Sequence, residues 1–258
     1  MVFADALLAR RIESAEAAIS RACAEGRPGA AVMECAGGLA VFQGADSPLT
    51  HAAGLGLHGP VPGRDLDTLE SFFRCRGACV SIELCPLADP GLLESLAARG
   101  YRATEFNTVL IKELAGTETI PTPRIRAAVE NERDLWSYAV GYGFFEQAEL
   151  TEEEMDVGRA IFAVPGVRCY LNLSEAGQPA GGGALAIRHG LGMLFADSTI
   201  PAFRRRGLHR DLIAARLNES AAQACDLAAA STLPGSPSQR NYERMGFRVA
   251  YTKVTLVG

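Results

Sequence analysis

The sequence predicts a layered α/β protein, of the α+β type, that contains two copies of one fold. Strand-like and helix-like segments alternate along the chain, which is typical of a sheet covered by helices. The segment 115–124 has two prolines, three threonines and no apolar periodicity, so it predicts a domain boundary. A shift of 146 positions pairs Cys79 with Cys225, and residues 100–102 (Gly-Tyr-Arg) with residues 246–248 (Gly-Phe-Arg). The same order of elements surrounds both copies, which favours a duplication.

Patterns before the boundary segment predict the first copy. Apolar residues at helical spacing near the N-terminus indicate an amphipathic helix that includes Leu8 and Ile12. Gly100 closes the last predicted helix of this half as a C-cap residue. We expect strands at 31–34, 39–43, 50–57, 80–85 and 101–114, and helices at 66–73 and 92–99.

The second half shows the same kinds of pattern, and two further helices. Thr151 and Glu154 form a capping box that marks the start of one of these helices. We expect strands at 125–129, 167–173, 180–188, 191–200, 226–233 and 247–257, and helices at 132–145, from 151, up to about 224, and at 238–245. Together the two halves predict a central sheet of mixed strand direction that is flanked by helices.

Composition excludes several classes of protein. The 258 residues carry a net charge of −5, whereas binding to nucleic acid favours a basic excess. No apolar run approaches the roughly 18–20 residues of a membrane span. The first arginines follow a short apolar stretch, which is the reverse of the order in a signal peptide. We therefore expect a cytoplasmic protein with no nucleic-acid or membrane partner, and the oligomeric state stays open.

The seven cysteines are scattered and odd in number, so we expect free thiols in a reducing compartment. Cys75 and Cys79 are four positions apart, but no second pair at similar spacing completes a zinc motif. We therefore predict no metal site.

A strand, a basic loop and a helix follow one another between residues 199 and 213. A helix N-terminus offers free backbone N–H groups and the positive end of the helix dipole, so it binds anions. Gly207 lets the backbone approach a ligand without a Cβ atom. The loop and the first turn also contain Arg204, Arg205, Arg206 and Arg210. These features predict a phosphate or pyrophosphate site.

This segment resembles a signature of the GNAT superfamily of acyl-CoA-dependent N-acetyltransferases. The family pattern Gln/Arg-x-x-Gly-x-Gly/Ala reads here as Arg204-x-x-Gly207-x-His209. A second family feature, Tyr-Glu-x-x-Gly-Phe at the end of a short helix, is present at 242–247. The resemblance covers about residues 124–258. His209 replaces the final small residue of the signature, and Ser236 stands where many members have an asparagine.

The resemblance implies tandem GNAT-like domains: a degenerate domain at 1–116, a linker at 117–123 and a catalytic domain at 124–258. It implies that acetyl-CoA, as co-substrate, lies between the strands at 191–200 and 226–233. An amine, on a small molecule or a peptide, then attacks the thioester directly. The implied acetyl-CoA-binding residues are Thr199, Ile200, Arg204, Arg205, Arg206, Gly207, Leu208, His209, Arg210 and Ser236.

The same resemblance implies catalytic and acceptor residues. Tyr242 takes the place of the general acid, and a phenol with a pKa of about 10 is protonated at neutral pH. Asp197 is the nearest candidate for a general base, and Glu146 is a second. The implied acceptor-binding residues are Trp136, Tyr142, Phe145 and Glu146.

The first half lacks the phosphate loop. Pro60 and Pro62 remove two N–H donors from the corresponding segment, so we expect this copy not to bind acetyl-CoA. Two other readings stay open for the chain: a non-catalytic acyl-CoA-binding or regulatory module, and a nucleotide-binding protein. The chain has no Gly-x-x-x-x-Gly-Lys-Ser/Thr sequence, which argues against an NTPase.

Overall fold

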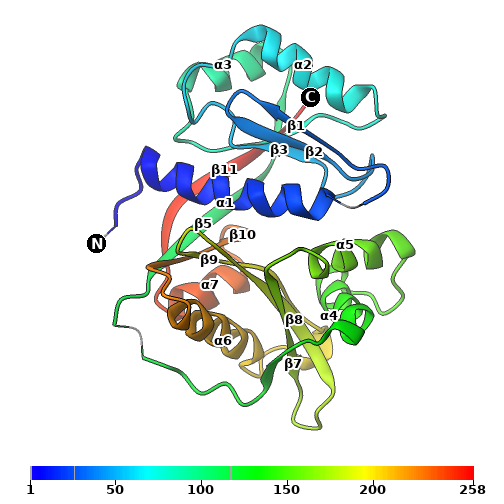
Figure 1. Ribbon diagram of the computed structural model, residues 1–258, viewed down its shortest axis with the longest axis vertical. Coiled ribbons are helices and arrows are strands. Elements are labelled where there is room, and N and C mark those ends of the chain that lie inside the picture. The colour runs from blue at the N-terminus through cyan, green and yellow to red at the C-terminus, as the bar shows by residue number, and fades with distance from the viewer. Residues whose placement is uncertain (1, 26, 117) are drawn as a thin grey trace. The chain divides into compact units, whose positions relative to one another are not determined.

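The computed structural model describes residues 2–25, 27–116 and 118–258. Residue 1, the first of the predicted N-terminal domain, and residue 117, the first of the predicted linker, lie outside the described residues. The described chain forms seven α-helices and eleven strands, and its strands pair in both parallel and antiparallel fashion. These observations confirm the predicted α/β class with mixed sheet structure (Figure 1).

The chain divides into two compact units. The first combines the residues described up to Val109 with Val249–Gly258, and the second is Leu110–Arg248. This division cuts the two long strands β5 (Arg102–Glu113) and β11 (Arg248–Val257), because β11 completes the sheet of the first unit beside β4. It therefore differs from the domain boundaries that the resemblance implied, which assign the C-terminal strand to the second domain.

Part of the segment expected to be a linker is hydrogen-bonded to a helix of the second unit. The Ile120 backbone N–H donates to Asn218 Oδ1 at 3.1 Å, and Asn218 Nδ2 donates to the Ile120 carbonyl at 2.8 Å. This part of the segment therefore lies against the helix that contains Asn218.

The first unit is a sheet in the order β1-β2-β3-β4-β11-β5. Its elements are α1 (Ala6–Ala24), β1 (Ala31–Cys35), β2 (Gly38–Phe42), β3 (His51–Ala53), α2 (Gly63–Arg74), β4 (Ser81–Leu84) and α3 (Pro90–Ala98). The strand predicted at 50–57 is thus short, and the chain turns after Ala53.

Helices cover both faces of the first unit's sheet (Figure 1). Successive side chains of β2 point to opposite faces, so Ala40 packs with the α2 and α3 side chains while Leu39 and Val41 pack under α1. Asp5 caps α1 by accepting a hydrogen bond from the Leu8 N–H at 2.8 Å. The apolar spacing of α1 is therefore explained by one buried helix face.

The second unit is a sheet in the order β5-β10-β9-β8-β7-β6. Its elements are β6 (Ile125–Ala127), α4 (Arg133–Phe145), α5 (Glu152–Phe162), β7 (Val167–Leu173), β8 (Pro179–Arg188), β9 (Leu191–Thr199), α6 (Leu208–Ala222), β10 (Leu227–Thr232) and α7 (Pro237–Arg244). The sequence β9-α6-β10-α7-β11 has the same order of strands and helices as β3-α2-β4-α3-β5 of the first unit, which agrees with the internal repeat.

Candidate functional site

Strands β9 and β10 of the second unit are paired at one end and not at the other. Their parallel register runs from the Leu191–Leu227 pair to the Leu194–Ala230 pair. Strand β9 then continues to Thr199 without a β10 partner in that register. Because backbone N–H and C=O groups need partners, this edge of β9 is suited to hydrogen-bond an extended ligand.

A bulge lies in β9 where this pairing has ended. Ala196 has a φ of 54°, and the β8–β9 register shifts between Gly182 and Ala184. Two residues of β9 therefore face Gly183 alone. A Cβ atom on Gly183 would be 2.8 Å from Asp197 Oδ1 and 3.0 Å from an Arg216 nitrogen, so the glycine makes room for both side chains.

Asp197 is the centre of a buried polar cluster. Its carboxylate accepts hydrogen bonds from the Arg216 guanidinium on α6 and from the Tyr242 hydroxyl on α7. His209, in the first turn of α6, places Nε2 3.0 Å from Asp197 Oδ2. Asn241 Nδ2 lies 3.1 Å from His209 Nδ1. His209 therefore accepts at Nδ1 and donates from Nε2 to the carboxylate.

Charges within this cluster set the protonation states. Burial by itself raises the pKa of Asp197, but Arg216 and the hydrogen bond from His209 hold that pKa well below its ordinary value. Burial and the negative charge of Asp197 raise the pKa of Tyr242 well above 10. At neutral pH the carboxylate is thus ionised and the phenol keeps its proton. A carboxylate with a lowered pKa is also a weak base.

The loop between β9 and α6 has an unusual backbone. Arg205 has a φ of 63° and Gly207 a φ of 79°, so both lie in the left-handed region. For a residue with a Cβ atom this conformation costs about 1–2 kcal/mol. The Asp211 N–H donates to the Gly207 carbonyl at 3.1 Å, and the N–H groups before it belong to the first turn. Strain of this kind is typical of ligand-binding loops.

The loop arginines divide into two kinds. Arg204 faces the protein: it donates to the Thr199 carbonyl at 3.0 Å and the Gly143 carbonyl at 2.9 Å, and pairs with Glu146 at 2.6 Å. Arg206 donates to the Ala202 carbonyl at 3.2 Å.

Arg205 and Arg210 differ from these two residues. Both are exposed, and neither has an ion pair or side-chain hydrogen bond to another part of the described chain. The two guanidinium groups are therefore available to an anion at the start of α6.

Four other residues of the second unit were predicted to bind acetyl-CoA. The side chains of Ile200 and Leu208 are buried. Thr199 ends β9 and is half-buried. Ser236 is the N-cap of α7, and its hydroxyl accepts from the Gln239 N–H at 3.1 Å.

The predicted acceptor residues separate in the structure. Trp136 is fully buried, and its indole N–H donates to the Tyr170 carbonyl at 3.1 Å, so it has no surface for a ligand. Tyr142 and Phe145 are half-buried on α4. Glu146 is the C-cap of α4, with a φ of 61°, and pairs with Arg204 of the loop between β9 and α6.

Arg216 and Gly183 are the important residues that sequence reasoning missed. Arg216 lies on the same side of its helix as Leu212 and Leu217, and a cation on an apolar face signals a buried carboxylate partner. Gly183 belongs to a run of three glycines in β8, where close backbone approach is the usual reason for glycine.

No group of three or more His, Cys, Asp or Glu residues within the described ranges could hold a metal ion. Every helix in those ranges is too short or too polar to cross a membrane.

Comparison with known proteins identifies the fold. No protein-family model and no curated protein matches the sequence. Among solved structures, the chain is similar to a GCN5-related N-acetyltransferase from Kribbella flavida, with a TM-score of 0.70, 19% identity and coverage of 97% of this chain and 95% of that one. It is also similar to a tandem GNAT protein from the clavulanic acid biosynthesis pathway, with a TM-score of 0.64, 15% identity and coverage of 98% and 93%.

A GCN5-related N-acetyltransferase from Sphaerobacter thermophilus has a TM-score of 0.58 and 16% identity, with coverage of 89% of this chain and 75% of that one. The chain therefore has the fold of GNAT proteins over nearly its whole length, as the resemblance implied. Identities below 20% establish the fold, and the chemistry must be argued from the site.

Proposed function

We propose that the second unit is an acyltransferase domain that moves an acetyl group from acetyl-CoA to an amine. The observation that supports this most is the end of β9–β10 pairing at Leu194, directly before the left-handed loop and the first turn of α6. An unpaired strand edge suits the amide groups of the pantetheine arm. A helix start with free cations suits a pyrophosphate. One ligand that needs both is an acyl-CoA.

The residues around the loop fit such a donor. Backbone N–H groups from Arg205 to Arg210 would hold the pyrophosphate, with the Arg205 and Arg210 side chains adding positive charge. Arg204 has a different role in this proposal, because it ties the loop to Thr199 and to Glu146. Loss of Arg204 would therefore loosen the loop instead of removing a ligand contact.

Acetyl-CoA supplies an activated thioester, whose C–S bond breaks as the amine nitrogen forms the new C–N bond. Tyr242 would donate a proton to the departing thiolate, since its raised pKa keeps the phenol protonated. Asp197 would orient that phenol and would not act as the general base, because its pKa is lowered. The amine would lose its proton to water or to Glu146.

The acceptor would approach from the α4 side of β9. Tyr142, Phe145 and Glu146 lie at the C-terminal end of α4, and Gly143 lets α4 contact β9: a Cβ there would be 2.4 Å from Ser198 Oγ. Half-buried aromatic rings and one carboxylate suit an amine with an apolar body. Trp136 would support this surface from the core.

The first unit would not share this activity. Pro62 stands at the N-cap of α2 without a side-chain cap, and the loop before it contains Pro60. Two proline nitrogens without hydrogen leave the loop before this helix short of donors.

The alternative is a module that binds acyl-CoA without catalysis. It is favoured by the burial of Tyr242, which is 1% exposed and already donates to Asp197. Turnover by the wild-type chain separates the two, because a binding module releases no free thiol from acetyl-CoA when an amine is added.

The test of the proposed function is binding of acetyl-CoA, measured by thermal shift beside CoA and ATP. A ligand at a hundred times its Kd stabilises by about 2.7 kcal/mol, which is about 5–11 °C for a domain of this size. Turnover is then sought with a panel of amines, by release of free thiol.

The matched variants are Gly207→Glu and Gly177→Glu. Gly177 has a φ of 75° in the turn before β8, so both changes place the same charge on a left-handed residue without a steric clash. A Cβ atom on Gly177 would have open space around it, and one on Gly207 would be in ordinary contact with Arg124 Nη2 at 3.8 Å. We expect Gly207→Glu to abolish the shift with acetyl-CoA and Gly177→Glu to keep it. Equal binding by both variants, or a larger shift with ATP, would contradict the proposal.

A further inference from the structure

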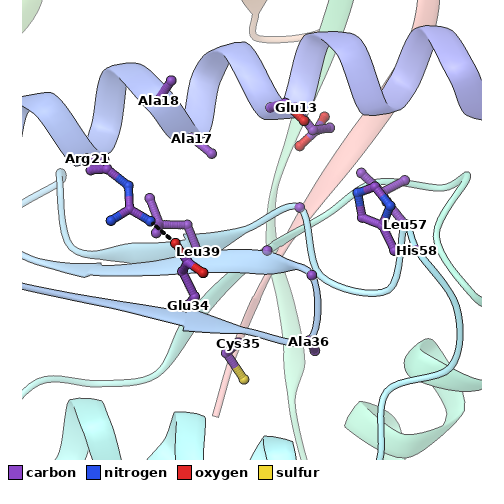
Figure 2. Close-up of a pocket in the computed structure, with 14 residues that line it drawn as sticks. Glu13, Ala17, Ala18, Arg21, Glu34, Cys35, Ala36, Leu39, Leu57 and His58 are labelled. Atoms are coloured by element: carbon purple, nitrogen blue, oxygen red, sulfur yellow. Dashed lines mark hydrogen bonds and ion pairs between the residues drawn. The ribbon is translucent and has the colours of Figure 1, made fainter.

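A cavity of about 450 Å³ lies within the first unit. Figure 2 shows it between α1, the turn that joins β1 to β2, and the loop after β3. Its volume is in the range of small-molecule sites, about 300–1,000 Å³. Ala17, Ala18, Leu39 and Leu57 give it apolar walls, and nothing in the proposed acetyl transfer uses it.

Glu13 extends from α1 toward this cavity (Figure 2). The residue is 1% exposed, and Oε1 accepts a hydrogen bond from the Tyr251 hydroxyl at 2.9 Å. Oε2 is buried and has no hydrogen-bond partner in the described part of the chain. A buried carboxylate oxygen without a donor is costly, so this atom is suited to receive a donor from a ligand.

Charges beside the cavity favour a cation. Lys253 Nζ lies near three carboxylates, at 2.5 Å from Glu16, 2.9 Å from Glu83 and 3.7 Å from Glu13. Its electrostatic attraction is therefore weakest for Glu13. At the rim, Arg21 pairs with Glu34 at 2.7 Å and neutralises it. Negative charge is thus in excess around Glu13.

We propose that this cavity binds a small organic cation, a primary ammonium group on a compact apolar body. The ammonium would donate to Glu13 Oε2, and the apolar body would pack against Ala17, Ala18, Leu39 and Leu57. This inference concerns the first unit and does not depend on acetyl transfer in the second.

The site has a pH dependence of known sign. Burial, opposed by Lys253, raises the pKa of Glu13 to about 7. The groups that act on it are Lys253 and Tyr251 of β11, Glu16 of α1 and Glu83 of β4. Ionised Glu13 becomes the major form above that pKa, so an ammonium ion binds more tightly at pH 8 than at pH 6.

The test uses the full chain and 2-phenylethylammonium as probe, followed by amide chemical shifts at pH 8. We expect saturable shifts confined to residues 13–21, 34–39 and 54–58. The uncharged analogue 2-phenylethanol has the same body and should bind far more weakly. Glu13→Gln should weaken binding of the probe by about 30-fold or more, because it removes a buried counter-charge.

Two further variants complete the test. Glu94→Gln removes an exposed carboxylate of α3 that does not line the cavity, and it should leave binding within about twofold. Ala18→Leu fills the cavity without touching a charge and should abolish binding, which keeps the test valid if Glu13→Gln does not fold. Shifts confined to the second unit, equal binding of the alcohol, or unchanged binding by both Glu13→Gln and Ala18→Leu would overturn the inference.

Discussion

Replacing Asp197 with asparagine would leave a fully buried guanidinium without its counter-ion. Arg216 is 0% exposed, and Asp197 is the carboxylate that pairs with it. Asparagine keeps the size of the side chain and one acceptor oxygen, so the change removes charge with little change in packing. His209 and Tyr242 would also lose the charged acceptor that they share.

The expected magnitude follows from these contacts. Breaking a buried ion pair by removing one partner costs about 3–5 kcal/mol. Arg216 keeps its hydrogen bonds to the Leu212 and Ala184 carbonyls, both at 3.1 Å, which places the cost near the lower end. For a unit of this size, about 3 kcal/mol lowers Tm by roughly 6–12 °C.

The assay is thermal unfolding at pH 7, with Glu219→Gln as the control. Glu219 pairs with Arg168, whose side chain is 53% exposed, and an exposed pair contributes at most about 1 kcal/mol. A Tm loss in Asp197→Asn no larger than that of Glu219→Gln would refute the view that the buried pair stabilises the unit.

Acid gives a second check of the same reasoning. The pKa of Asp197 is lowered in the folded state, so its contribution to stability is full above the unfolded pKa of about 4 and is lost as pH falls below it. The difference in Tm between wild type and Asp197→Asn should therefore narrow between pH 4 and pH 2. A difference that widened there would contradict the sign of the shift.

Four other changes have defined outcomes. Gly207→Glu should abolish acetyl-CoA binding in the thermal-shift assay while Gly177→Glu keeps it. Tyr242→Phe should lower kcat by about 10²–10⁴-fold with little change in KM for acetyl-CoA, and full activity would remove the proposed acid. Gly183→Ala should cost about 1–3 kcal/mol in urea unfolding, since its Cβ meets Asp197 at 2.8 Å; an unchanged midpoint would show that the cluster can shift. Glu13→Gln should weaken binding of 2-phenylethylammonium by about 30-fold or more, as measured by chemical shifts.

Local patterns predicted most helices and strands. The one helix start predicted from a capping residue was confirmed: Thr151 accepts from the Glu154 N–H at 3.2 Å, as a capping box requires. The strand predicted at 50–57 was wrong in length, because Gly54 and Gly56 both have positive φ and turn the chain after Ala53. Alternation of apolar residues does not distinguish a strand from such a turn.

The candidate site was predictable only in part. The basic loop and Gly207 are contiguous, so their order alone indicates an anion site at a helix start. Trp136 belongs to an aromatic group that could face either a ligand or the core, and only the packing of α4 on β8 places it in the core.

The sequence by itself determined the elements, their order in two copies and the loop that precedes α6, because hydrophobic period, caps and turns act between near neighbours. Tertiary structure decided which distant groups meet. Asp197 meets Arg216 and Tyr242 across 19 and 45 positions, and Tyr251 reaches Glu13 across 238. Arg216 and His209 lower the pKa of Asp197, whereas burial raises the pKa of Glu13. Both effects depend on residues that are distant in the sequence, so no local pattern records them.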